Sequence, residues 1–374
     1  MQAPAPEGSP GNHTEIADSQ CLVMDPLVSV LMITYNHAPY IAQAIEGVLS
    51  QQTDFPLELI IGEDCSTDRT REIVLNLERQ HPETIRVLFS EKNVGMHKNL
   101  RRVAAAARGE YVAFCEGDDW WHRPDKLQRQ ISALRPDPSL VCVAGGIRHV
   151  SATGDTLEAE GPADAVRPPF PVDYPSIIFS RILLYTCTAV CRTDAVRQVL
   201  DGDGLCRDQA PLMADHSLWI ELSQLGHILY LPEALASYRH TPNSAVRQSD
   251  PLRVRRFEMS FHNINYRALE RYPLPEGAAR TSRAQADFAR QILLKAAWNG
   301  EAEVAKKQLR RLRGLGEKVG ARELGCAVLA WVPLPRRWLT TIFRKLTPRL
   351  ARAGLNLRKH LAPAAVFSHR TDKP

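Results

Sequence analysis

A short apolar run that leads directly into three carboxylates is the feature that most limits how this chain can fold. Residues 111–115 read Tyr-Val-Ala-Phe-Cys, and residues 116–121 read Glu-Gly-Asp-Asp-Trp-Trp. The run predicts a strand buried in a parallel sheet, and such sheets bind ligands outside the carboxyl ends of their strands. Crowded carboxylates repel one another unless a cation lies between them, and Mg²⁺ and Mn²⁺ take oxygen ligands. We therefore interpret Glu116 and Asp118 as a metal and diphosphate site, with a solvated acidic turn as the alternative.

The strand-and-helix unit occurs three more times before this stretch. Each unit joins an aliphatic, β-branched run to a segment whose apolar residues recur at three- and four-residue spacing, which is the periodicity of a helix. Four such units within about 110 residues predict an α/β fold with a doubly wound, mostly parallel sheet. The predicted strands are 27–33, 57–61, 84–89 and 111–115, and the predicted helices begin near 39, 70, 96 and 124.

Polar residues follow every one of these strands. The carboxyl ends of parallel strands lie on one edge of a sheet, so these residues can line one site. The chain has no GxGxxG or GxxxxGK[ST] loop, which disfavours a dinucleotide-binding dehydrogenase and a P-loop nucleotidase. The residues after the first three strands include Thr34, Asn36, Glu63, Asp64 and Asn93.

Length and cysteine usage are those of an intracellular globular protein. The 374 residues suffice for about two domains, and no apolar run approaches the roughly 18 residues of a membrane span. Eight cysteines are scattered without a CxxC pair, so we expect free thiols in a reducing cytoplasm. Residues 1–25 lack the basic start and apolar core of a secretory signal, and we expect a disordered tail there.

Positive charge is concentrated at the C-terminal end. The chain carries a net charge of +5, yet residues 301–374 hold 17 Lys and Arg against 5 Asp and Glu, so the rest of the chain is net negative. Residues 335–346 place Arg, Trp and aliphatic side chains at helical spacing, which is typical of a helix on an anionic membrane surface. A solvated helical appendage is the alternative. No nucleic-acid recognition motif accompanies the charge, so nucleic acid is not an expected partner.

Four motifs in order make the chain resemble the family-2 glycosyltransferases of GT-A fold over about residues 27–240. They are Thr-Tyr-Asn at 34–36, Glu-Asp-Cys-Ser-Thr-Asp at 63–68, Asn-Val-Gly at 93–95 and Glu-Gly-Asp-Asp-Trp-Trp at 116–121. Two motifs depart from the family pattern, which has Asp-Asp-Gly-Ser for the second and Asp-x-Asp for the start of the fourth. Both altered motifs still supply carboxylate side chains.

The resemblance implies a role for each residue of these motifs in binding a nucleotide-diphospho-sugar. The residues expected to border the nucleotide, or to hydrogen-bond its base or ribose, are Thr34, Tyr35, Asn36, Glu63 and Asp64. Those expected near the sugar are Asn93, Gly95, Asp119 and Trp120. Bracing of its own loop is the alternative role for Asp119, and packing explains the aromatic side chains equally well. Glu116 and Asp118 are expected to hold ribose and the metal, either Mg²⁺ or Mn²⁺.

Two later segments contain the remaining candidate site residues. Residues 213–226 predict a helix with Asp215 at its start, where the helix dipole stabilises a carboxylate. The resemblance implies that Asp215 is the general base, with a simple helix cap as one alternative and His216 as an alternative base. Residues 233–240 predict a strand that ends in Arg239, an expected phosphate contact, and His240, a candidate diphosphate or metal contact.

We therefore predict a GT-A catalytic domain over residues 26–245 and a helical, basic region over 246–374. The predicted activity is inverting transfer of a sugar to a glycan or lipid-linked oligosaccharide in bacterial surface polysaccharide synthesis, in the cytoplasm or at the inner face of the cell membrane. A nucleotidyltransferase and a non-catalytic sugar-binding protein stay open as alternatives. Residues 148–174 predict a surface excursion on the acceptor side, and residues 176–192 predict a return to the sheet.

Overall fold

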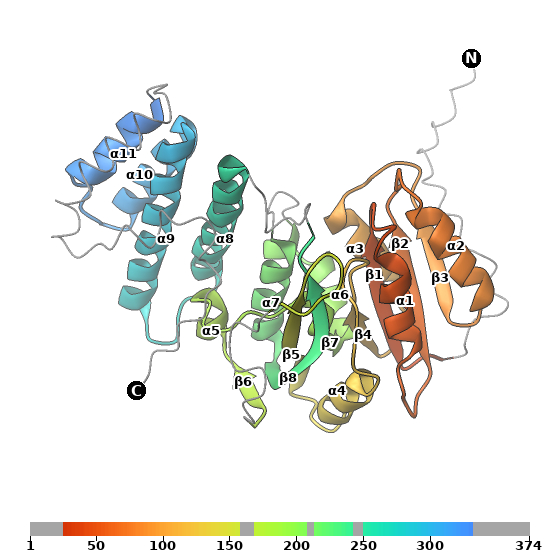
Figure 1. Cartoon of the computed structure of the whole chain (residues 1–374). Helices are drawn as coiled ribbons and strands as arrows, with labels where there is room; N and C mark the ends of the chain where they lie inside the picture. Colours follow the sequence, from red (N-terminus) through yellow and green to blue (C-terminus); the bar gives the residue numbers. More distant parts are fainter. Residues whose placement is uncertain (1–24, 158–167, 208–212, 242–249, 332–374) are drawn as a thin grey trace, which may run out of the picture. The chain divides into compact units, whose positions relative to one another are not determined.

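The computed structural model of the protein describes residues 25–157, 168–207, 213–241 and 250–331 (Figure 1). These residues fall into two compact units. The first contains the chain up to Asp137 together with Thr186–Arg197 and Leu235–Ser237, and the second contains the remainder. Residues 1–24 of the predicted N-terminal tail lie outside the described residues, and the domain boundary near residue 245 stays a prediction.

The first unit is built on four parallel strands that match the predicted apolar runs. They are β1 (Val28–Thr34), β2 (Leu57–Glu63), β3 (Ile85–Phe89) and β4 (Tyr111–Phe114). Their order is β3-β2-β1-β4, and the short β7 (Val190–Arg192) pairs with β4 in the antiparallel direction. Most residues of the four parallel strands are buried, as expected for a sheet covered on both faces. The predicted fold class is confirmed.

A helix follows each of the four parallel strands. The helices are α1 (Ile41–Leu49), α2 (Thr70–Gln80), α3 (Met96–Ala106) and α4 (Lys126–Leu134). In α1, Ile41, Ala44, Ile45 and Val48 recur at helical spacing and all are buried. Helix α3 packs against β1 and β2 (Figure 1). Because the strands are parallel, every loop from a strand to its helix begins at the same edge of the sheet.

Between residue 137 and the C-terminal helices, the described residues form three further strands and three further α-helices. The strands are β5 (Leu140–Val150), β6 (Phe170–Val172) and β8 (His227–Arg239), and the helices are α5 (Tyr174–Ile178), α6 (Thr193–Asp201) and α7 (Ala214–Leu225). Strand β6 pairs with β8 in the antiparallel direction. Residues 158–167 of the predicted surface excursion lie outside the described residues.

The prediction that residues 176–192 form a strand is wrong for most of that segment. Its start belongs to α5, and only β7 at its end is a strand. The reason lies just upstream, because the Asp173 side chain accepts a hydrogen bond from the backbone N–H of Ser176 at 2.8 Å and Pro175 occupies the first turn of α5. A capping Asp followed by proline is a strong signal for a helix start.

Four helices pack together at the end of the described chain. They are α8 (Pro251–Arg271), α9 (Ala278–Asn299), α10 (Ala302–Gly314) and α11 (Ala321–Trp331). Their shared core is rich in alanine on α9, with Met259, Tyr266 and Leu312 from the neighbouring helices. Small side chains let helices approach closely, which accounts for the tight packing of α9 against α8, α10 and α11. No helix in the described part of the chain is long and apolar enough to cross a membrane.

Candidate active site

The loop after β1 is hydrogen-bonded to the loop after β2. The Asn36 side-chain oxygen accepts a hydrogen bond from the backbone N–H of Thr67 at 2.8 Å, and the backbone N–H of Asn36 donates to Ser66 Oγ at 3.0 Å. The backbone N–H of His37 donates to Thr70 Oγ1 at 2.8 Å. Asn36 has a φ of 57°, a conformation that asparagine tolerates better than most residues. The predicted site residues of these two loops are therefore brought together.

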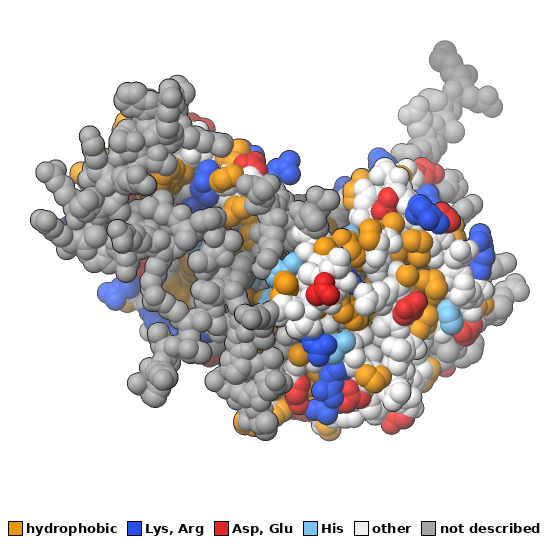
Figure 2. Space-filling model, viewed as in Figure 1, with side chains coloured by type: hydrophobic (Ala, Val, Ile, Leu, Met, Phe, Trp, Pro, Cys, Tyr) orange, Lys and Arg blue, Asp and Glu red, His pale blue; other side chains and the backbone are white. Residues whose placement is uncertain are grey.

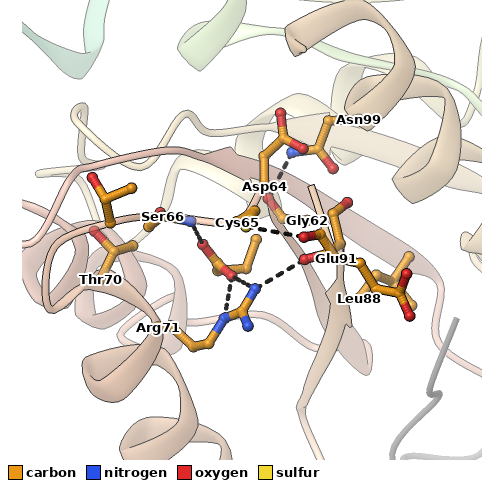
Figure 3. A network of polar contacts seen from close by, with 12 residues as sticks. Gly62, Asp64, Cys65, Ser66, Thr70, Arg71, Leu88, Glu91 and Asn99 are labelled. Atoms are coloured by element: carbon orange, nitrogen blue, oxygen red, sulfur yellow. Dashed lines mark hydrogen bonds and ion pairs between the residues drawn. The ribbon is translucent and has the colours of Figure 1, made fainter. Parts of the chain in front are cut away.

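Glu63 ends β2 and is fully buried. Its Oε1 accepts a hydrogen bond from the backbone N–H of Ser66, and its Oε2 accepts one from Arg71 Nε, both at 2.6 Å. Arg71 also donates to the backbone carbonyl of Ser90 at 3.1 Å (Figure 3). Through these buried contacts, Glu63 fixes the loop that follows β2. This placement does not suit the predicted contact between Glu63 and the nucleotide, because the protein encloses the carboxylate.

Asp64 joins the loop after β2 to the start of α3. Its two carboxylate oxygens accept hydrogen bonds from the backbone N–H groups of Val94 and Gly95, at 2.8 and 2.9 Å. Gly95 has a φ of 85°, which favours glycine at this position. Nearby, the Asn99 side chain donates to the carbonyl of Gly62 at 2.7 Å (Figure 3). Each carboxylate oxygen of Asp64 keeps a second lone pair, so its predicted contact with the nucleotide stays a prediction.

Arg71 and Arg102 are residues of this edge that sequence reasoning missed. Arg102, on α3, donates to Ser90 Oγ and to the carbonyl of Leu88. Burial lowers the pKa of Arg102, and the negative charges of Asp64 and Glu63 oppose that shift. The only available signal was a basic residue on the helix after β2 and another on the helix after β3, and such residues are usually solvent-exposed.

The acidic turn follows β4, where the backbone N–H of Asp119 donates to the carbonyl of Glu116 at 3.1 Å. Asp119 is 4% exposed, whereas the Asp118 side chain is 25% exposed. Burial raises the pKa of the Cys115 thiol well above its ordinary value, and the charges of Glu116, Asp119 and Asp118 raise it further. The turn therefore concentrates negative charge at the end of a buried strand.

The loop after β1 lies against this turn. His37 Nε2 is 4.0 Å from Asp118 Oδ2. A Cβ atom on Gly117 would lie 2.7 Å from Thr34 Oγ1 and 2.9 Å from His37 Nδ1, so glycine is required there by close approach. Both of those atoms are buried and lack a hydrogen-bond partner among the described residues. Tyr35, between them in the chain, is 41% exposed.

The two tryptophans of the turn have different surroundings. Trp120 pairs with Ser237 through two backbone hydrogen bonds of 3.2 and 2.8 Å. Trp121 is 2% exposed, and its Nε1 donates to the carbonyl of Cys187 at 2.7 Å. The buried ammonium of Lys126 lies 4.0 Å from the centroid of the Trp121 ring, a favourable cation–π distance. Trp121 therefore packs beneath the turn.

The donor atoms at this edge suit a metal bound together with a diphosphate. Within the described residues, no group of three or more His, Cys, Asp and Glu side chains is arranged to hold a metal ion. Mg²⁺ needs only one or two carboxylates when phosphate oxygens and waters complete its shell. Glu116 and the partly exposed Asp118 are the candidate pair, and the two buried polar atoms of Thr34 and His37 lie beside Gly117, which lies between Glu116 and Asp118 in the chain.

In the second unit, Asp215 and His216 begin α7. Asp215 lies in the first turn, and its Oδ1 accepts a hydrogen bond from the backbone N–H of His216 at 2.8 Å. His216 is buried, with Nε2 2.6 Å from Asn265 Oδ1 and its ring 4.7 Å from that of Phe261. Burial lowers the pKa of His216 to about 4, so the ring is neutral near pH 7 and a weak base. Asp215 remains the stronger candidate for the base.

Arg239 is the last residue of β8, and His240 directly follows it. Arg239 is 4% exposed and donates to the carbonyl of Ala152 at 3.0 Å. His240 Nε2 lies 2.7 Å from His149 Nδ1, with Tyr238 in edge contact with both rings. One of the two imidazoles must donate the proton of this hydrogen bond, so the tautomers of the two rings are linked. The predicted phosphate and metal contacts of these residues stay predictions.

Comparison with known proteins finds relatives over the part of the chain that carries these motifs. Residues 29–199 match the family model described as glycosyl transferase family 2. An uncharacterised protein of Mycobacterium tuberculosis is 33% identical over 212 residues, which cover 57% of this chain and 58% of that relative. A Bacillus subtilis protein named for teichuronic acid biosynthesis, the glycosyltransferase TuaG, is 31% identical over 226 residues, 59% of this chain and 81% of the relative.

Solved structures share the fold at lower identity. TarS of S. aureus, in a crystal structure with UDP-GlcNAc, superimposes with a TM-score of 0.52 and 19% identity, covering 82% of this chain and 79% of that one. The sheet and the acidic turn thus define a protein of GT-A fold. The chain belongs to glycosyl transferase family 2, which confirms the predicted resemblance. It spans 58% of the length of the mycobacterial relative.

Proposed function

We propose that this protein is an inverting glycosyltransferase that moves a sugar from a nucleotide-diphospho-sugar to an acceptor hydroxyl. The observation that carries the proposal is the acidic turn after β4, with Asp118 partly exposed beside the loop that ends β1. Family membership supports the same class of reaction. Neither a dehydrogenase nor a P-loop nucleotidase explains carboxylates at this position without a glycine-rich loop.

The loops of the first unit bind the donor in this proposal. Thr34, Tyr35 and Asn36 border the nucleotide, and Asp64 reaches its base or ribose with the lone pairs that Val94 and Gly95 leave unused. The residues assigned to the sugar side are Asn93, Gly95, Asp119 and Trp120. Glu63 is assigned a positioning role, because its ion pair with Arg71 fixes the loop that carries these contacts.

Glu116 and Asp118 hold Mg²⁺ or Mn²⁺ in this proposal, with Arg239 and His240 on the diphosphate. A bound divalent ion supplies positive charge that stabilises the departing nucleoside diphosphate. Asp215 removes the proton of the acceptor hydroxyl while that oxygen attacks the anomeric carbon and the bond to the diphosphate breaks. The first turn of α7 supports this role, because the positive end of a helix stabilises the carboxylate.

The acceptor is proposed to be a glycan or a lipid-linked oligosaccharide of a bacterial surface polysaccharide. The relative named for teichuronic acid biosynthesis supports this acceptor class, and so do relatives named chondroitin synthase at 25% and 26% identity. The basic C-terminal sequence supports work at the inner face of the cell membrane.

Nucleoside diphosphate release from UDP-, GDP- and dTDP-sugars, with Mn²⁺, Mg²⁺ or EDTA, tests the proposal. UDP-GlcNAc is the first donor to try, because TarS was solved with it. We expect metal-dependent release from one donor, lost in Asp118→Asn and kept in Asp54→Asn, a control at an exposed site of the same unit. Failure of every donor to bind with metal present would contradict the proposal. Release of pyrophosphate from a nucleoside triphosphate would indicate a nucleotidyltransferase instead.

A further inference from the structure

Helix α8 supplies a buried side chain that contacts the start of α7. Asn265, on α8, is 0% exposed, and its Oδ1 lies 2.6 Å from His216 Nε2. Its Nδ2 donates a hydrogen bond to the backbone carbonyl of Ile178 at 3.1 Å. Ile178 is the last residue of α5, and a carbonyl at that end of a helix has no partner within the helix. Asn265 therefore joins α5 to α7 within the second unit.

The carbonyl of Ile178 fixes the direction of the hydrogen bond between Asn265 and His216. A carbonyl oxygen can only accept, so the Asn265 amide must present its NH₂ group to Ile178 and its oxygen to His216. The His216 ring must therefore donate from Nε2. Burial lowers the pKa of His216 to about 4, so the ring is neutral near pH 7 and has a single N–H. The contact with Asn265 selects the tautomer that has this hydrogen on Nε2.

The same contact holds the backbone beside Asp215. The His216 ring also packs on Phe261, with the ring centroids 4.7 Å apart, and Phe261 lies one helical turn before Asn265 on α8. Two residues of α8 thus hold the ring of His216. The backbone N–H of His216 in turn donates to Asp215 Oδ1 at 2.8 Å. A series of contacts therefore runs from the carbonyl of Ile178 to the carboxylate of Asp215.

Burial distinguishes this contact from charged pairs on the surface. The face of the first unit in Figure 2 shows acidic and basic side chains interspersed, and exposed pairs of that kind contribute little to stability. His216 and Asn265 are 7% and 0% exposed, so water competes little for their hydrogen bond. Because a buried polar group is costly to leave without its partner, the two side chains keep one arrangement.

We propose that His216 and Asn265 are positioning residues for Asp215. They hold the backbone N–H that binds the Asp215 carboxylate, and so fix the direction in which this carboxylate meets the acceptor hydroxyl. The proposal rests on the proposed function of Asp215 as the general base. It makes α8 part of the transferase, although α8 lies beyond the predicted domain boundary near residue 245.

NMR of the histidine side chains tests the contact without any need for activity. In full-length protein labelled with ¹⁵N-histidine, long-range ¹H–¹⁵N spectra near pH 7 report which ring nitrogen bears the hydrogen. We expect the neutral Nε2–H tautomer for His216, recognised as the signal that His216→Phe removes. A Nδ1–H tautomer or a charged ring would overturn the proposal.

Nucleoside diphosphate release tests the positioning role. The probe is UDP-GlcNAc with Mn²⁺, or whichever of the UDP-, GDP- and dTDP-sugars the wild type turns over, with water as the acceptor that Asp215 deprotonates. We expect His216→Phe, in protein that circular dichroism shows to be folded, to lower kcat about tenfold with donor KM unchanged. His216→Gln should stay within about threefold of the wild type, since glutamine can donate from about the position of Nε2. The matched control is His227→Phe, at an exposed site of the same unit, which should equal the wild type.

The double variant Asp215→Asn, His216→Phe separates positioning from stability. If His216 acts through Asp215, adding His216→Phe to Asp215→Asn lowers kcat by less than about twofold, and assays with enzyme in excess over radiolabelled donor follow such slow rates. A further loss of about tenfold in that background would assign His216 a purely structural role and overturn the proposal. Equal losses in His216→Phe and His216→Gln would overturn it as well. Failure of the wild type to turn over any donor would contradict the proposed function itself, and the positioning role with it, whatever the NMR spectra show.

Discussion

Two acidic regions at the same edge of the first unit use their carboxylates in different ways. Glu63 and Asp64, after β2, are 0% and 3% exposed, and all four of their carboxylate oxygens accept hydrogen bonds from the protein. Asp118, after β4, has a side chain that is 25% exposed, and its Oδ2 lies 4.0 Å from His37 Nε2. The first region holds loops in place, and the second leaves the Asp118 side chain partly exposed to solvent.

Backbone N–H groups account for the role of the carboxylates after β2. Ser66, Val94 and Gly95 all present N–H groups toward the β2 carboxylates, since each lies in a loop or at a helix start where such groups have no helical partner. Residue type alone therefore does not assign a role at this edge. The backbone donors around Glu63 and Asp64 let both carboxylates stabilise the loops of this edge.

The largest expected effect comes from Asp118→Asn. Removing the partly exposed charge should lower metal-dependent donor turnover by about 10²- to 10³-fold, because stabilisation of the leaving group is lost. The free energy of unfolding should change by less than about 0.5 kcal/mol, since Asp118 is not enclosed by the protein. Steady-state kinetics and urea unfolding of one preparation measure both quantities. A large loss of stability with normal turnover would show that Asp118 stabilises the fold, as Glu63 does, and does not act in turnover.

Glu63→Gln should have the opposite signature. The change breaks the ion pair between Glu63, whose side chain is 0% exposed, and Arg71, whose side chain is 40% exposed. Breaking a buried pair costs about 3–5 kcal/mol, and solvent screening of Arg71 reduces our expectation to about 2 kcal/mol. Urea unfolding measures the loss, with Arg69→Gln as the control because the Arg69 pair with Glu72 is exposed. An unchanged midpoint would show that Glu63 does not hold its loop.

Asp64→Asn should produce a smaller and more local change. An amide presents only one oxygen, so either Val94 or Gly95 loses the acceptor for its backbone N–H, at a cost of about 1–2 kcal/mol. Amide hydrogen exchange should rise at those two positions. The exposed neighbour Asn93→Ala serves as the control. Unchanged protection of both amides in Asp64→Asn would contradict the assigned contacts.

Periodicity predicted the elements of this edge better than it predicted the partners of each side chain. The strand ending at Glu63 and the helix beginning at Thr70 follow from apolar spacing, which is a local property of the chain. The pairing of Glu63 with Arg71 depends on how the loop turns, and spacing does not encode that. The same limit applies to residues 176–192, where an apolar run fits a strand or a buried helix equally and the Asp173 cap decides for α5.

The smallest expected effect concerns backbone conformation in the loop after β2. Cys65 has a φ of 61°, and the family pattern has glycine at this position. Cys65→Gly should raise the free energy of unfolding by about 0.5 kcal/mol, because relief of the left-handed strain outweighs the lost contact from Sγ to the Glu91 carbonyl at 3.4 Å.

Asn36→Gly is the matched control for that change, because Asn36 has nearly the same φ, 57°, but uses its side chain to hold Thr67. There the lost hydrogen bonds should outweigh the relief of strain, and the free energy of unfolding should fall by about 1 kcal/mol. Thermal unfolding of both variants measures whether each change raises or lowers the free energy of unfolding. Stabilisation by both would mean that strain dominates and that the Asn36 side chain does not hold the two loops together.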